Sequence, residues 1–158
     1  MPSWYVVNVK PKKEGQVERL FVEGGFEIYC PKYRRERRVV PFFPGYAFLR
    51  FDFPEQFQMV KYTRGVKRVV GTDDGPTPVP DEVVLGIRDR ERDGLIAFER
   101  YGEEPAVGDE IEVVEGPLKG LKGIFRREVG ESERVMILLN YVSYQAQLLI
   151  EKGKIKKA

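Results

Sequence analysis

The chain has 158 residues, of which 42% are hydrophobic and 33% are charged, and its formal net charge is +2. This composition provides enough apolar material for a folded core and excludes a low-complexity tail. No window approaches the roughly 18 consecutive apolar residues of a membrane-spanning helix. The aromatic run that begins at Trp4 also lacks the basic-then-apolar order of a signal peptide. We therefore expect a globular protein of the cytoplasm that is not bound to a membrane.

The sequence contains no histidine and a single cysteine, Cys30. Histidine is the commonest general base near neutral pH and the commonest zinc ligand, so its absence argues against most hydrolases and metalloenzymes. Cys30 lies in an apolar run between Tyr29 and Pro31, which favours a small buried residue over a nucleophile. We expect a binding protein with no catalytic residues, no metal and no cofactor.

Residues 1–88 alternate between strand and helix patterns. The patterns predict strands over residues 4–9, 26–31, 46–53 and 66–70, and helices over residues 12–22 and 54–65 and from Pro80 to about residue 88. A basic arm at residues 32–38 follows the second strand and could equally be a solvated loop. The order βαββαβα predicts an α+β domain in which helices cover one side of a mostly antiparallel sheet.

Residues 89–105 are polar and charged and are interrupted by glycine and proline, as in a linker. Beyond them, short strands are predicted over residues 110–115, 123–127, 134–140 and 145–151. About 50 residues of this kind can close into a small β-barrel. The first 88 residues carry 15 basic and 11 acidic side chains and the rest 12 and 14. This asymmetry suggests a basic domain near nucleic acid and a second domain that meets another partner.

The predicted strand at residues 46–53 has aromatic side chains on both faces. Strand alternation sends Tyr46 and Phe48 to one face and Leu49 and Phe51 to the other. Because helices are expected on one side only, the face of Tyr46 and Phe48 is predicted to be exposed, with Phe42 or Phe43 close by. An exposed aromatic patch usually marks a protein contact. In the alternative interpretation, the linker or the second domain covers these rings permanently.

The segment 134–151 satisfies two periods at once. At strand spacing, Val135, Ile137 and Leu139 share a face. At helical spacing, a continuous apolar stripe runs through Val135, Leu138, Leu139, Val142, Ala146 and Leu149. The turn glycines and β-branched residues of 108–123 favour the barrel. We therefore expect a barrel, with a helical hairpin as the alternative.

Several motifs, in order, resemble the successive signatures of the NusG family of transcription elongation factors. They are Trp-Tyr-Val-Val at 4–7, Phe-Pro-Gly-Tyr-Ala-Phe at 43–48, Thr-Arg-Gly-Val at 63–66, and Gly-Asp at 108–109 with Gly-Pro-Leu-Lys-Gly at 116–120 and Gly123. The last group is similar to the KOW motif of an SH3-like barrel. Trp4, Lys10 and residues 63–66 and 136–140 are more similar to the specialised RfaH-type antitermination paralogues. Residues 140–144 depart from the phenylalanine-glycine-arginine stretch of the general factor.

The resemblance implies an RNA polymerase-binding domain at residues 1–88, a linker at 89–105 and a KOW barrel at 106–158. Phe43, Tyr46 and Phe48 would bind the clamp helices of the largest polymerase subunit. Thr63 and Arg64 would reach the opposite lobe of the polymerase or the upstream DNA. By bridging the cleft, a monomer would suppress pausing on a subset of operons, without bond chemistry.

The resemblance also implies further partners. Lys10, Lys12, Lys13 and Arg19 could form a basic edge that approaches non-template DNA, or they could be an ordinary solvated face. The C-terminal domain would meet a ribosomal protein or Rho. In RfaH-like proteins this domain can also fold as a helical hairpin that covers the aromatic residues and refolds to a barrel on release. The alternative function is an RNA- or ribosome-binding accessory protein that uses its KOW barrel.

Overall fold

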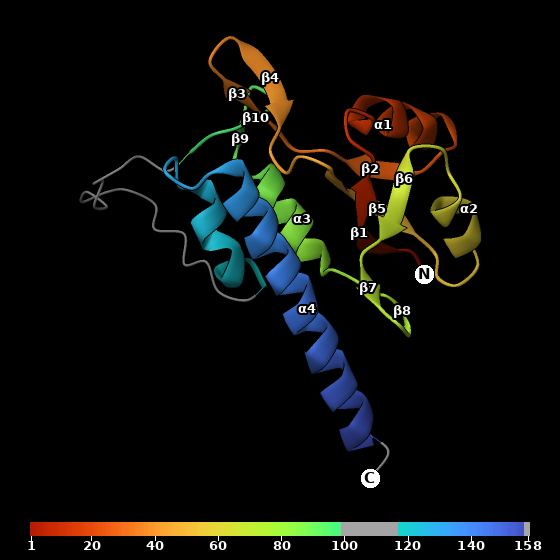
Figure 1. The fold of residues 1–158 in the computed structure, drawn as a ribbon. Coiled ribbons are helices and arrows are strands. Elements are labelled where there is room, and N and C mark those ends of the chain that lie inside the picture. The colour runs from red at the N-terminus through yellow and green to blue at the C-terminus, as the bar shows by residue number, and fades with distance from the viewer. Residues whose placement is uncertain (99–116, 157–158) are drawn as a thin grey trace.

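A four-stranded antiparallel sheet forms the centre of the N-terminal part of the molecule, in the order β2, β5, β1, β6. The computed structural model describes residues 1–98 and 117–156 (Figure 1). The strands of this sheet are β1 (Ser3–Val9), β2 (Glu27–Tyr29), β5 (Tyr46–Phe51) and β6 (Val66–Val69). Each overlaps a predicted strand, so the predicted antiparallel sheet is confirmed.

Two helices cover one face of this sheet. They are α1 (Glu14–Glu23) and α2 (Phe57–Lys61), and both lie on the same side in Figure 1. Their buried residues Val17, Phe21 and Val60 form one cluster with inward-facing strand residues, which include Tyr5, Val7, Leu49 and Phe51. The alternation of β1 and β5 explains this cluster, because every second side chain points to the same face.

A third helix, α3 (Asp81–Arg88), lies on the opposite face, so the prediction of helices on one side only is wrong. Its buried side carries Val83, Val84 and Ile87, as predicted, and these belong to the cluster of Trp4, Val6 and Phe48. The reason lies in the segment before the helix. The Val79 amide donates to the Trp4 carbonyl oxygen at 2.8 Å, which brings the chain back along β1 before α3 begins.

Three short hairpins surround the sheet. They are β3 (Lys32–Arg35) with β4 (Arg38–Pro41), β7 (Gly71–Thr72) with β8 (Gly75–Pro76), and β9 (Glu91–Arg92) with β10 (Leu95–Ile96). The predicted basic arm is thus an ordered hairpin that projects from the sheet (Figure 1). Residues 91–96 of the predicted linker form the third hairpin, in which Ile96 is buried.

The C-terminal part of the described chain is helical. A 3-10 helix, η1 (Pro117–Phe125), is followed by the long helix α4 (Glu131–Lys156). The strands predicted over residues 123–127, 134–140 and 145–151 are therefore wrong, and residues 117–156 form no barrel. The strand predicted over residues 110–115 lies outside the described residues. None of the helices in the described part of the chain is long and apolar enough to cross a membrane.

Burial explains why helix prevails over strand propensity here. Leu138, Val142 and Ala146, which share the predicted helical stripe, are buried in the structure. A β-branched or aromatic residue costs at most about 0.7 kcal/mol in a helix interior relative to alanine. Full burial of an apolar side chain contributes about 1.5–3 kcal/mol. The packing of the stripe therefore outweighs the preference of individual residues for strand.

Candidate functional site

Aromatic side chains, among them Trp4 of β1, gather on the sheet face that carries α3. We call six of them the aromatic face: Tyr29, Tyr33, Phe42, Phe43, Tyr46 and Phe48. Its rings touch in series: the centroids of Phe42 and Phe43 lie 5.0 Å apart, and those of Phe43 and Phe48 lie 6.1 Å apart. The sequence correctly placed Tyr46 and Phe48 together on one face of β5, opposite Leu49 and Phe51.

The C-terminal helices cover the aromatic face, so the prediction of an exposed patch is wrong. Phe43 and Phe48 are each 1% exposed, and Tyr46 is half-buried. They share one buried cluster with residues of η1 and α4, namely Leu121, Ile124, Phe125, Leu138, Tyr141 and Val142. The ring of Phe125 stacks on Phe42 at 6.2 Å between centroids. The alternative interpretation, in which the second domain covers the rings, describes this arrangement.

Arg134, at the start of α4, is the most deeply buried charged side chain among the described residues, with 2% of it exposed. Its Nε donates to the Phe42 carbonyl oxygen at 3.0 Å, and its Nη1 donates to the Val129 carbonyl oxygen at 2.8 Å. The guanidinium carbon lies 4.7 Å from the ring centroid of Tyr33 and 4.6 Å from that of Phe42. Cation–π contact and two hydrogen bonds partly replace the lost hydration. Arg134 thus fastens α4 to the aromatic face.

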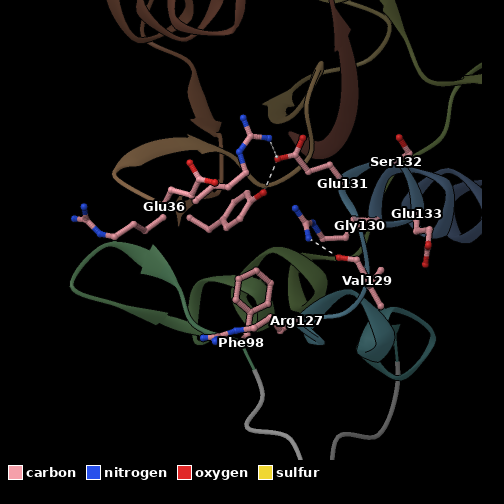
Figure 2. Close-up of a pocket in the computed structure, with 12 residues that line it drawn as sticks. Glu36, Phe98, Arg127, Val129, Gly130, Glu131, Ser132 and Glu133 are labelled. Atoms are coloured by element: carbon pink, nitrogen blue, oxygen red, sulfur yellow. Dashed lines mark hydrogen bonds and ion pairs between the residues drawn. The ribbon is translucent and has the colours of Figure 1, made fainter.

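A second polar contact joins α4 to the β3–β4 hairpin. The Tyr33 hydroxyl and Arg35 Nη1 both donate to the same oxygen, Oε1 of Glu131, and the arginine bond measures 2.7 Å. Burial raises the pKa of the Tyr33 hydroxyl, and its hydrogen bond to the Glu131 carboxylate raises it further. The contact borders a groove of about 790 Å³ between the hairpin, Phe98 and the first turn of α4 (Figure 2).

Sequence reasoning missed both Arg134 and Glu131. The two residues stand in the run Glu-Ser-Glu-Arg at 131–134, where a charged stretch is ordinarily solvated. The helical stripe was the one available signal, because Arg134 lies one turn before Leu138 and so begins the buried side of α4. A charge at the start of an apolar helical face suggests a polar contact under that face.

Other residues are also predicted to contact the polymerase or DNA, and most of them lie at one end of the sheet. The Lys10 amide donates to the Gly65 carbonyl oxygen at 2.9 Å, which holds the loop after β1 against the turn after α2. Lys10, Lys12, Lys13 and Arg64 are exposed there. The Thr63 hydroxyl donates to the Met59 carbonyl oxygen at 2.7 Å and so satisfies a carbonyl group of α2.

Gly65 allows the loop after β1 and the turn after α2 to approach each other. Its φ is +95°, a conformation that favours glycine, and an added Cβ would lie 2.7 Å from Cγ2 of Val17. The turn before Tyr46 meets the same end of the sheet, since the Val9 amide donates to the Gly45 carbonyl oxygen at 2.7 Å. The basic loop, the Thr63–Arg64 pair and Tyr46 are thus neighbours.

Arg19 lies apart from this group, on the exposed side of α1, and no described contact joins it to Lys10 or Lys13. The functional roles predicted for all of these residues stay predictions. In the described part of the chain, no three metal-ligating side chains lie close enough together to hold a metal ion.

One protein family matches the N-terminal part of the chain. The model of a family described as NusG, transcription termination factor nusG, matches residues 2–88. A solved structure described as "Domain interaction in Thermotoga maritima NusG" is similar, with 22% identity and a TM-score of 0.45, over 66% of this chain and 68% of that chain. A comparison with curated protein sequences gave no match.

Proposed function

This chain belongs to the NusG family of transcription factors, and from that premise we propose that it is an elongation and antitermination factor of the specialised RfaH type. Its aromatic face would bind the clamp helices of the largest RNA polymerase subunit, in the cytoplasm. Thr63 and Arg64 would contact the opposite lobe of the polymerase or the upstream DNA. The basic loop at Lys10 would contact the non-template DNA strand. Bridging the cleft would suppress pausing on a subset of operons by binding alone.

One observation carries the proposal: η1 and α4 bury the residues that would dock on the polymerase. The same apolar surface cannot contact α4 and the polymerase at once. The C-terminal helices would therefore act as an internal competitor, and the chain would bind polymerase only after they leave. A ligand shifts such an equilibrium by its differential affinity for the open state. This requirement would restrict the protein to sites where an additional contact favours opening.

The alternative function, an RNA- or ribosome-binding accessory protein, depended on a resident KOW barrel. Residues 117–125 and 131–156 are helical instead, so the strands that would form such a surface are absent from the described residues. A contact with Rho or a ribosomal protein through the C-terminal segment would therefore require its release and refolding. In this proposal, that refolding follows the opening of the aromatic face.

The test is capture of the full-length chain on immobilised core RNA polymerase. Arg134→Ala removes the side chain that fastens α4, so this variant should bind more polymerase than the wild type. Arg126→Ala changes an exposed arginine just before α4 and should behave like the wild type. Adding Tyr46→Ala to Arg134→Ala should weaken binding about 30-fold, because truncating a central interface aromatic costs about 2 kcal/mol or more.

Two outcomes would contradict the proposal. If Arg134→Ala captured no more polymerase than the wild type, the helices would not limit docking. If the double variant bound as tightly as Arg134→Ala alone, the aromatic face would not be the docking surface.

A further inference from the structure

The groove between the β3–β4 hairpin and α4 has the size of a binding site for a small molecule. Its volume of about 790 Å³ lies within the usual range of such sites, which is about 300–1,000 Å³. Residues 33–36 of the hairpin form one wall, Arg127 and residues 129–134 form the other, and Phe98 closes a third side (Figure 2). The groove therefore exists only while α4 packs beside the hairpin.

At this groove, α4 begins without a side-chain cap. The Arg134 amide donates to the Gly130 carbonyl oxygen at 2.9 Å, so Gly130 occupies the N-cap position, where it has no side chain to accept from the next amides. Within the described residues, no hydrogen bond satisfies the amides of Glu131, Ser132 and Glu133. An added Cβ at Gly130 would meet no atom within 4 Å, so the space beside it is open. A helix N-terminus with free amides favours an anion.

The side chain of Arg134 is a second, independent feature that points to an anion. It lines the groove and is almost fully buried. Its Nε and Nη1 donate to carbonyl oxygens, but Nη2 is buried and has no hydrogen-bond partner in the described structure. Burying a donor without an acceptor is costly, and a charged donor forms strong hydrogen bonds. An anionic acceptor beside Arg134 would therefore gain a strong bond and remove this cost.

The charges around the groove also favour an anion. The ionised side chains that line it are Arg34, Arg35, Glu36, Arg127, Glu131, Glu133 and Arg134. Arg35 and Glu131 are paired with each other at 2.7 Å. That pair leaves three guanidinium groups against two carboxylates, and the two acids, Glu36 and Glu133, lie at opposite margins of the groove in Figure 2. The positive end of the helix dipole adds to the excess of positive charge.

We propose that this groove binds the phosphate group of a small molecule at the N-terminus of α4. The free amides of the first turn donate to the phosphate, and Arg127 and Arg134 supply guanidinium groups, which match phosphate oxygens in geometry and charge. The half-buried side chains of Phe98 and Val129 offer an apolar wall to the remainder of the molecule. Inorganic phosphate and nucleotides share the chemistry that this site would recognise.

Such a ligand would hold α4 against the hairpin. Because the two walls of the groove come from separate parts of the chain, a molecule bound between them stabilises the arrangement in which they meet. This consequence for polymerase binding rests on the proposed function: the ligand would lower the fraction of molecules with an uncovered aromatic face. The binding site itself does not depend on the polymerase.

The first experiment is isothermal titration calorimetry of the full-length chain with inorganic phosphate, adenosine diphosphate or adenosine, at constant ionic strength and without polymerase. One phosphate compound at least should bind at one site per chain, whereas adenosine, which has no phosphate, should not bind. Tighter binding of adenosine diphosphate than of inorganic phosphate would assign the site to nucleotides, and equal binding would assign it to free phosphate. Adenosine binding as tight as that of its diphosphate, or no binding of either phosphate compound, would overturn the proposal.

A matched pair of arginine variants locates the site. Arg127→Gln should weaken the binding of the phosphate compound about tenfold, as expected for the loss of one hydrogen bond between charged groups. Arg126→Gln changes an exposed arginine one residue earlier that does not line the groove, and it should bind like the wild type. Equal affinities of the two variants would place the ligand elsewhere.

Gly130→Asp separates loss of the site from loss of structure. Aspartate is a favoured N-cap residue, so its carboxylate should satisfy the amides of the first turn and leave α4 at least as stable. The same carboxylate would repel the phosphate and use its donors, so binding should weaken by more than about tenfold. The uncharged Gly130→Ala should weaken it less, because the amides stay free.

Amide hydrogen exchange gives a readout that does not depend on affinity. The phosphate compound should slow exchange in the first turn of α4 in the wild type and not in Gly130→Asp. Wild-type affinity in Gly130→Asp, or protection confined to other parts of the chain, would refute the site. The capture experiment with Arg134→Ala and Tyr46→Ala tests the proposed function separately, so the failure of one proposal can be distinguished from the failure of the other.

Discussion

The two faces of the central sheet are both covered by helices, but the covers differ in origin and in chemistry. On one face, α1 and α2 directly follow the strands they cover, and the buried residues of the two helices are Val17, Phe21 and Val60. On the other, η1 and α4 return from far along the chain and add the buried Arg134 and the Glu131 contact to the apolar packing.

This difference separates a permanent core from a removable cover. A permanent core gains nothing from a buried cation, because replacing a buried charge by apolar side chains is often neutral or stabilising. A cover that must leave benefits from groups that water can solvate again once they are exposed. The polar contacts of α4 therefore fit a surface that is closed in one state and open in another.

The largest expected effect is a change of fold in the cover when it loses the sheet. The isolated fragment 106–158 has no aromatic face on which to bury the stripe of Leu138, Val142 and Ala146. Its β-branched residues and turn glycines should then prevail, and far-UV circular dichroism should show strand. The full-length chain should show more helix per residue over the same segment. Helix in the isolated fragment would contradict this prediction.

A pair of core substitutions compares the two faces directly. Phe51→Ala should lower the free energy of unfolding of the sheet by about 3–5 kcal/mol, as for other buried phenylalanines. Leu138→Ala should leave the unfolding of the sheet close to the wild type. It should instead speed amide hydrogen exchange in α4 while β1 and β5 stay protected. Urea titration and exchange mass spectrometry measure the two effects.

Met136→Ala, at a position that is 62% exposed on α4, is the control for Leu138→Ala and should alter neither measurement. If Leu138→Ala lowered the stability of the sheet as much as Phe51→Ala, the two faces would form one cooperative core. The distinction between core and cover would then fail.

The smallest effect should come from the Tyr33 hydroxyl. Tyr33→Phe removes one hydrogen bond to Glu131, so it should weaken the packing of α4 on the sheet by about 0.5–1.5 kcal/mol at pH 8. Because the folded pKa of Tyr33 is raised, its contribution is complete below the unfolded pKa of about 10 and is lost as pH rises toward the folded value. The difference between wild type and variant should therefore shrink above pH 10.

Urea titration of the full chain, followed by its helical circular dichroism signal at several pH values, measures this difference. Tyr144→Phe, at an exposed position of α4, is the matched control and should resemble the wild type throughout. A difference between Tyr33→Phe and wild type that did not vary with pH would show that the hydroxyl does not titrate with the closed state.

The sequence was sufficient for the N-terminal sheet because its signals are local. Alternation in β1 and β5 and the helical spacing of Val17 and Phe21 each decide between strand and helix within a few residues. The short α2 is the exception, because the pattern extended over residues 54–65 whereas the helix spans Phe57–Lys61.

What covers the aromatic face could not be predicted from local patterns. Alternation places Tyr46 and Phe48 on one face, but it does not say which distant segment will meet them. Local patterns also leave the C-terminal segment undecided: the spacing of Leu138 and Val142 fits a helix, and the spacing of Ile137 and Leu139 fits a strand equally well. Arg134 shows most clearly why local patterns are not enough, since its burial depends on the carbonyl oxygen of Phe42, 92 residues earlier in the chain.

The cover and the face that it hides belong to one polypeptide, so closure is unimolecular. Diluting the protein should not loosen α4, whereas docking on polymerase is a second-order event and depends on the polymerase concentration. Raising the level of the factor itself would mainly add closed molecules. In the proposed function, the open fraction would therefore follow the supply of docking sites rather than the abundance of the factor.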